Sequence, residues 1–146
     1  MRNDAALALS QLQAKEAIPE LIACLKNETE SDDGFIIAVV FALGELGAKD
    51  AIPELTRIVN IHFEKTIGTI ATGVLASLGE KVDVDATGLT ELLSYRKSWL
   101  NRVQTCELLT RLKITAAIPK ISKLLTNVDW QVREAAKAAL KQLQEK

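Results

Sequence analysis

Ala17-Ile18-Pro19, Ala51-Ile52-Pro53 and Ala117-Ile118-Pro119 are three copies of one tripeptide, and together they hold all three prolines of the chain. The second copy follows the first by 34 residues, and the third follows the second by 66 residues, which is close to two such intervals. A fixed interval of this length is typical of proteins built from stacked structural repeats. The sequence therefore predicts a repeat architecture in which one copy has lost its proline.

A series of leucines has the same period. Five apolar stretches end at intervals of 34, 32, 34 and 31 residues, at Leu12, Leu46, Leu78, Leu112 and Leu143. Ahead of each of these leucines, apolar residues recur three or four positions apart, which is the spacing of one face of a helix. A second stripe of this kind follows each Ala-Ile-Pro. Since proline presets a helical φ and the first helical turn needs no N–H from it, we expect each proline to begin a second helix.

The pattern predicts an all-α fold with about nine helices in four and a half repeats, forming one domain over residues 1–146. The repeats are expected near 1–31, 32–63, 64–97 and 98–127, with a half repeat at 128–146. The helices are expected near 1–13, 17–27, 33–46, 51–61, 65–78, 87–96, 99–112, 117–126 and 130–144. Gly47 and Gly79 stand where glycine commonly ends a helix. The third repeat departs from the others, because Thr87 replaces the proline and residues are inserted around Lys81–Asp85.

The last copy opens with Asp129-Trp130-Gln131-Val132-Arg133-Glu134-Ala135-Ala136. With the proline-started second helix, this phrase resembles the HEAT repeat family, in particular the short form of phycobilisome-lyase-like proteins. The resemblance covers essentially the whole chain and is strongest over 35–59 and 114–143. Arg2 and Arg102 occupy the slot of Arg133, ten residues before the closing leucine. The resemblance implies a right-handed α-α superhelix, a solenoid whose inner curve is lined by second helices.

Two other repeat classes fit less well. Tetratricopeptide repeats share the period, but they require several aromatic residues and a proline after the second helix. Here aromatic residues make up only 4% of the chain, and the proline precedes the second helix. Ankyrin repeats begin with a Thr-Pro-Leu-His phrase that the sequence lacks.

The composition is that of one folded domain. The 146 residues are 48% hydrophobic and 25% charged, and no apolar run approaches the roughly 20 residues of a membrane-spanning helix. A net charge of −1 disfavours a nucleic-acid partner, which requires a concentrated positive surface. The N-terminus lacks the layout of an export signal, so we expect a cytoplasmic protein with no membrane partner. Cys24 and Cys106 are expected to be buried thiols, too far apart to form a disulfide.

No residue pattern predicts a catalytic, cofactor or metal site. His62 is the only histidine, and we expect it to cap a helix C-terminus or to lie at the surface. An acidic segment precedes the third predicted helix and holds Glu28, Glu30, Asp32 and Asp33. It lacks the alternating ligands and the glycine of a calcium loop, so helix capping by Asp32 or Asp33 is the expected role.

The second helices are expected to present a mixed-charge groove with a basic C-terminal end. Its candidate partner-binding residues are Glu20, Lys26, Glu54, Arg57, Glu91, Tyr95, Lys120 and Lys123. Trp99 and Trp130 share one repeat slot, thirteen residues before a closing leucine. They either pack over the neighbouring turn or serve as a pair of aromatic anchors for a partner.

The expected function is that of a non-catalytic scaffold for a protein partner whose identity the sequence does not give. The first alternative is a subunit or chaperone of a bilin lyase, which the family resemblance implies. The second is a nucleic-acid-binding protein of the HEAT-like class. Ile18, Ile22 and Cys24 add apolar surface to the helix at 17–27, so an N-terminal face is expected that self-associates or is covered by further chain.

Overall fold

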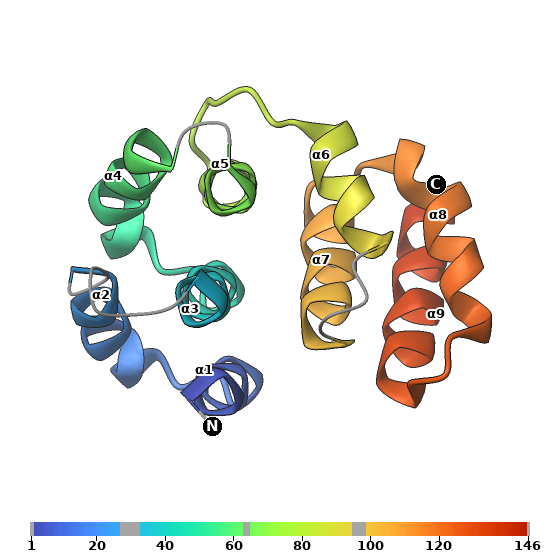
Figure 1. Cartoon of the computed structure of the whole chain (residues 1–146), viewed down its shortest axis with the longest axis horizontal. Coiled ribbons are helices and arrows are strands. Elements are labelled where there is room, and N and C mark those ends of the chain that lie inside the picture. Colours follow the sequence, from blue (N-terminus) through green and yellow to red (C-terminus); the bar gives the residue numbers. More distant parts are fainter. Residues whose placement is uncertain (1, 27–32, 63–64, 95–98, 146) are drawn as a thin grey trace. The chain divides into compact units, whose positions relative to one another are not determined.

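A computed structural model describes residues 2–26, 33–62, 65–94 and 99–145, without the side chains of residues 2–4 and 7. Regular structure in these ranges is helical throughout, so the predicted all-α fold is confirmed (Figure 1). The α-helices are α1 Arg2–Gln11, α2 Ile18–Lys26, α3 Asp33–Glu45, α4 Ile52–Ile61, α5 Thr66–Ser77, α6 Ala86–Glu91, α7 Trp99–Arg111, α8 Ile118–Lys123 and α9 Trp130–Gln144. None of the helices in the described ranges is both long and apolar enough to cross a bilayer.

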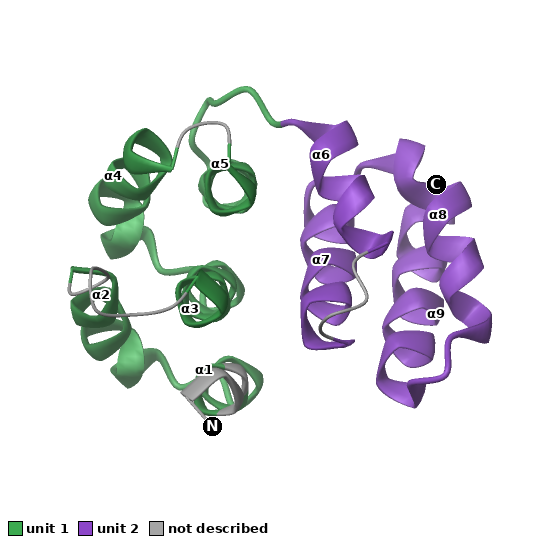
Figure 2. Cartoon of the chain, in the orientation of Figure 1, with its two compact units in different colours: residues 1–84 green, residues 85–146 purple. Residues whose placement is uncertain are grey.

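The chain divides into two compact units, residues 1–84 and 85–146 (Figure 2). In unit 1, helices α1, α3 and α5 pack on one another as one layer, and α2 and α4 form a second layer beside them. Helix α3 lies in the middle of the first layer, and every residue from Phe35 to Gly44 is buried. This explains why its sequence is apolar all round rather than striped.

Unit 2 has the same two-layer arrangement on a smaller scale. Helices α7 and α9 pack together, α6 lies against α7, and α8 lies against α9. The second helices of this unit are short and continue as 3₁₀ turns, η4 at Leu92–Ser94 and η6 at Leu124–Thr126. The predicted helices 87–96 and 117–126 are therefore each an α-helix followed by a 3₁₀ turn, with residues 95–96 outside the described ranges. The single domain over 1–146 stays a prediction.

A short 3₁₀ turn precedes each Ala-Ile-Pro helix, which the sequence pattern did not predict. These turns are η1 Lys15–Ala17, η3 Lys49–Ala51 and η5 Thr115–Ala117. In each turn the alanine N–H donates to a carbonyl three residues earlier, as from Ala51 to Ala48 at 3.0 Å. The proline then stands in the first turn of the helix, as predicted, where no N–H is required.

The first helix of a repeat ends with one residue at positive φ. Gly47 (φ 65°) and Gly79 (φ 102°) fill this slot in unit 1, which confirms their expected role as helix-ending glycines. Gln13 (φ 54°) and Lys113 (φ 57°) fill the same slot in the first and fourth repeats without being glycine. Residues with a Cβ adopt this conformation at a cost in free energy.

The degenerate third junction uses a different start signal. Residues 80–85 form an irregular segment, and the boundary between the two units falls within it. Asp85 Oδ1 accepts a hydrogen bond from the Gly88 N–H at 2.8 Å, so an aspartate caps α6 where proline begins the other second helices. Gly88 has no Cβ, and a Cβ there would clash with this carboxylate.

Candidate functional site

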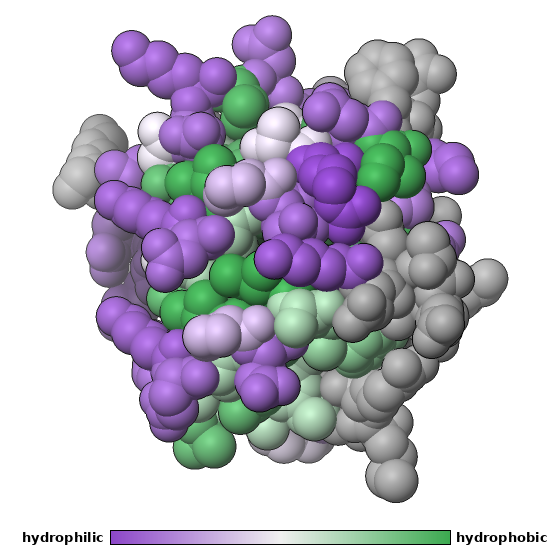
Figure 3. Space-filling view, turned by 90° about the vertical axis from the view of Figure 1, so that its left-hand side faces the viewer, coloured by the Kyte–Doolittle hydropathy of each residue, from purple (hydrophilic) through white to green (hydrophobic). Residues whose placement is uncertain are grey.

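The second-helix face of unit 1 is polar and partly neutralised. Figure 3 shows the side of the molecule that carries α2 and α4, where hydrophilic side chains gather with apolar surface between them. Glu20 and Lys26 lie exposed on α2, and Glu54 and Arg57 are half-buried on α4. The four candidate residues of this unit therefore lie on the second helices, as the repeat register predicts.

Arg57 holds two second helices together. Its Nε donates to Glu54 Oε2 at 2.9 Å, and its Nη2 donates to the Leu25 carbonyl oxygen at 3.0 Å. Leu25 lies in the last turn of α2, whose carbonyl groups have no partner within the helix. The guanidinium thus caps the C-terminus of one second helix from the next, which gives Arg57 and Glu54 a structural role.

The corresponding face of unit 2 is hollowed and basic. A cavity of about 270 Å³ is lined by Leu93, Ser94, Arg102, Lys120, Lys123, Leu124 and Asn127, and we call it the basic hollow. Lys120 and Lys123 are three residues apart on α8, so their side chains lie on one face of the helix. Lys120 Nζ donates to Ser94 Oγ at 3.3 Å, which links α8 to the end of η4. Two of the predicted partner-binding residues therefore meet at one cavity.

Arg102 is a third cation of the basic hollow, and it comes from a first helix, α7. Its side chain is 10% exposed, and its Nη2 lies 3.6 Å from Asp129 Oδ2. The buried Nε of Arg102 has no hydrogen-bond partner among the residues that the structure describes. A buried guanidinium normally has its N–H groups satisfied, so this donor is an exception that the local packing does not explain.

Arg133 shows what the same repeat slot does in the next copy. Its Nη1 donates to the carbonyl oxygens of Asn127 at 2.7 Å and Val128 at 3.1 Å, which fastens α9 to the turn that precedes it. Arg102 occupies the equivalent position, yet it lines the basic hollow. The side chain of Arg2, the third arginine of this series, lies outside the described part.

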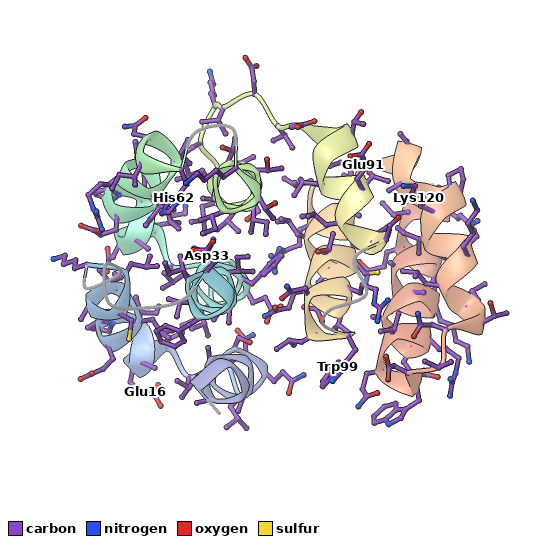
Figure 4. All side chains as sticks on the ribbon, viewed as in Figure 1. Glu16, Asp33, His62, Glu91, Trp99 and Lys120 are labelled. Atoms are coloured by element: carbon purple, nitrogen blue, oxygen red, sulfur yellow. The ribbon has the colours of Figure 1, made fainter. Side chains whose placement is uncertain are left out.

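The remaining predicted site residues are scattered. Glu91 is exposed on α6 and does not line the basic hollow, and Figure 4 labels it together with Lys120. Tyr95 lies outside the described ranges. Trp99 is half-buried at the start of α7, whereas Trp130 is 62% exposed at the start of α9. The two tryptophans share a repeat slot but not an environment, and only Trp130 offers most of its surface to a partner.

His62 is the C-cap residue of α4, as expected for one of its two predicted positions. Cys106 is buried, but Cys24 is only half-buried, which corrects the expectation of two buried thiols. Burial, and secondarily the Glu107 carboxylate, raises the pKa of the Cys106 thiol to about 12. Among the described residues, no group of three or more His, Cys, Asp or Glu side chains could hold a metal ion. Asp33 begins α3, while Glu28, Glu30 and Asp32 lie outside the described part.

Comparison with known protein families decides the repeat class. Residues 1–27 and 37–60 match the family model described as PBS lyase HEAT-like repeat. These two regions are similar to PBS lyase HEAT-like repeats. The predicted resemblance is thereby confirmed, and the second matched region overlaps the strong copy at 35–59. A search of the curated proteins gives no significant match.

Sequence reasoning placed Lys120 and Lys123 on the second-helix face but missed Arg102. It considered only second helices, and Arg102 belongs to a first helix. A signal was present, since Arg102 shares its slot with Arg133 and so lies at a repeat junction. Asn127 was also missed, because it follows the predicted second helix at 117–126 instead of lying within it.

Proposed function

We propose that the chain is a non-catalytic scaffold that binds a protein partner through its second-helix face, with the basic hollow of unit 2 as the main contact. The observation that carries this proposal is the meeting of Arg102, Lys120 and Lys123 at one cavity. Charges placed in this way on a rigid helical support steer a complementary partner and fix its orientation. HEAT-like stacks present such surfaces repeatedly along the chain.

Charge reversal tests the proposal. Lys120→Glu combined with Lys123→Glu turns two attractive charges into repulsive ones, and we expect capture of a partner from the native cell extract to fall at least tenfold. The melting temperature should stay unchanged, because Lys123 is exposed and the side chain of Lys120 makes a single hydrogen bond among the described residues, to Ser94. Affinity capture followed by quantitative mass spectrometry measures the loss.

The matched control reverses two other lysines of the same unit. Lys137 and Lys141 are exposed on α9 and do not line the basic hollow. Lys137→Glu with Lys141→Glu changes net charge by the same amount, so it should leave the captured proteins in place. Equal losses in both double variants would mean that overall charge, and not the basic hollow, governs capture.

A role beside a bilin lyase is the second candidate, and the name of the matched family is the observation that favours it. In that case the chain would assist attachment or detachment of a chromophore. Co-expression with a bilin and its acceptor protein would then give visible absorbance that depends on this chain. A protein partner captured without any bilin-dependent absorbance favours the scaffold.

A further inference from the structure

The basic hollow has an excess of positive charge that no described side chain neutralises. Arg102, Lys120 and Lys123 contribute three cations, and the one carboxylate paired with them is that of Asp129, 3.6 Å from Arg102 Nη2. Among the described residues, the Lys123 ammonium makes no hydrogen bond or ion pair, and Lys120 donates only to a neutral serine. Like charges gathered in a recess repel one another, so an anion bound there would be held strongly.

The residues of the basic hollow also carry N–H donors, which are the groups that bind oxygen atoms of an anion. The buried Nε of Arg102 lacks a hydrogen-bond partner among the described residues. Asn127 Oδ1 accepts the Asp129 N–H at 2.9 Å, so the other polar group of this side chain is the Nδ2 amide, which is a donor. Arg102, Lys120, Lys123 and Asn127 come from α7, α8 and the turn after η6, and all four line the basic hollow.

The size and the charge of the basic hollow suit a small anionic group as its ligand. Its volume of about 270 Å³ lies at the lower end of small-molecule sites and gives room for a single phosphoryl group. A phosphoryl group carries about −1.5 to −2 charges and three acceptor oxygens, which suits several cations and N–H donors better than a carboxylate does.

We propose that the basic hollow binds the phosphoryl group of a phosphorylated serine or threonine side chain in the partner protein. Recognition of phosphorylated segments by clustered cations is a general mode of peptide binding. This inference rests on the proposed scaffold function, because it names the chemistry of the partner. A nucleic-acid backbone fits less well, since it requires a line of separate phosphate contacts, whereas these cations converge on one recess and the chain has a net charge of −1.

The test uses the full chain, labelled with ¹⁵N, and four probes: N-acetyl-phosphoserine amide, N-acetyl-serine amide, acetate and a short DNA duplex. We expect phosphoserine amide to shift the backbone amide signals of 120–127 and 99–104 in a saturable manner, at least tenfold more tightly than acetate. The serine probe should cause no shift. Lys120→Gln with Lys123→Gln should weaken phosphoserine binding at least tenfold, while Lys137→Gln with Lys141→Gln should leave it unchanged.

The Arg102→Lys variant distinguishes the contribution of the guanidinium group from that of its positive charge. Lysine keeps a cation at this position but cannot supply the several N–H groups of a guanidinium, so we expect phosphoserine binding to weaken severalfold. If this buried substitution prevents folding, the two lysine variants still decide the matter, because Lys123 is exposed and Lys120 half-buried.

Several outcomes would overturn the proposal. They are the absence of shifts at these amides, equal binding of acetate, equal binding in the Lys120/Lys123 variant, or tighter binding of the DNA duplex with a steep salt dependence. The outcome is separable from that of the scaffold proposal. If capture depends on Lys120 and Lys123 but phosphoserine does not bind, the scaffold stands and its partner is unphosphorylated. If phosphoserine binds but capture is insensitive, the basic hollow is an anion site and the scaffold proposal fails at this face.

Discussion

The two units use the same two repeat slots in different ways. The first and fourth positions after the proline are Glu54 and Arg57 in unit 1, and Lys120 and Lys123 in unit 2. In unit 1 the two side chains pair at 2.9 Å, and Arg57 also caps α2. In unit 2 the two lysines line a hollow, and neither forms an ion pair with a described residue.

The difference shows how a repeat fold can divide stability from binding. A side chain that donates to backbone carbonyl groups at a junction between repeats stabilises the packing of the two helices. Under the proposed function, a side chain in the equivalent slot without such a partner uses its charge to bind an outside ligand. A repeat register therefore locates the exposed positions, while the pairing between them decides which positions are free to bind.

Cys106 of unit 2 is buried and Cys24 of unit 1 is half-buried, and the reactivity of Cys106 gives the largest effect we expect. Cys106 in unit 2 has its pKa raised from 9.0 to about 12 by burial and by Glu107. Because the thiolate is the reactive form, its population at pH 8 falls by about a thousandfold, and burial further blocks access. In the Cys24→Ser variant, we therefore expect Cys106 to react with a thiol reagent at least about a thousandfold more slowly than in the chain unfolded in urea.

The raised pKa of Cys106 also makes the free energy of unfolding depend on pH. The folded state holds the Cys106 proton up to about pH 12, whereas the unfolded state releases it near pH 9.0. The stabilisation is complete below pH 9 and is lost as the pH rises above it, by up to about 1.4 kcal/mol per pH unit. Urea unfolding of Cys106→Ala should show a shallower alkaline decline. A rapid reaction of Cys106 in the folded chain would contradict its burial.

Truncating the fourth position after the proline should affect the two units unequally. Arg57→Met removes a charged hydrogen bond to the Leu25 carbonyl and leaves Glu54, 17% exposed, without its cation. The side chain of Arg57 is 37% exposed, so solvent screening limits the loss to about 1–2 kcal/mol. Lys123→Met in the matched slot should change stability by less than about 0.5 kcal/mol.

Urea denaturation with hydrogen exchange at the end of α2 measures both variants. Loss of protection around residues 24–26 in Arg57→Met alone would locate the damage at the capped helix end. Equal losses in Arg57→Met and Lys123→Met would remove the distinction between a structural and a free slot.

Much of the fold follows from local sequence chemistry. Proline at a helix start and glycine at a helix end act within a few residues, so the helix boundaries at Pro53 and Gly47 could be predicted. The 3₁₀ turns before the second helices could not, because the search followed the spacing of apolar residues in α-helices, which a turn of three residues does not show. The Asp85 cap was missed for a similar reason, since the search was for a replacement of proline at Thr87.

The candidate site was predictable only in part. Helical spacing places Lys120 and Lys123 on one exposed face, and this needs no knowledge of other segments. The inclusion of Arg102 depends on how α7 packs against neighbouring elements, which a single sequence does not state. The hydrogen bond from Arg57 to the Leu25 carbonyl oxygen joins residues 32 positions apart. Helical spacing does not reveal such a contact, so it predicted that Arg57 binds a partner.

The helix-ending slot provides the last and smallest test of the comparison. Unit 1 has glycine there in two of its three repeats, while unit 2 has Lys113 at φ 57°. A left-handed conformation costs a residue with a Cβ about 1–2 kcal/mol, and the greater freedom of glycine in the unfolded chain offsets part of the gain. We expect Lys113→Gly to stabilise the chain by about 0.5–1 kcal/mol, measured by urea denaturation.

Gly47→Ala is the matched control, because nothing lies within 4 Å of the Cβ it would add and any loss reports the backbone alone. It should destabilise unit 1 by about 1 kcal/mol. The backbone bonds of the two slots are alike, since the next residue donates to a carbonyl five positions earlier at 3.0 Å in both, from Ala48 to Leu43 and from Ile114 to Leu109. If Lys113→Gly lowers stability while Gly47→Ala also lowers it, the lysine side chain must contribute contacts that outweigh its backbone strain. The slot would then differ between the units in packing as well as in residue type.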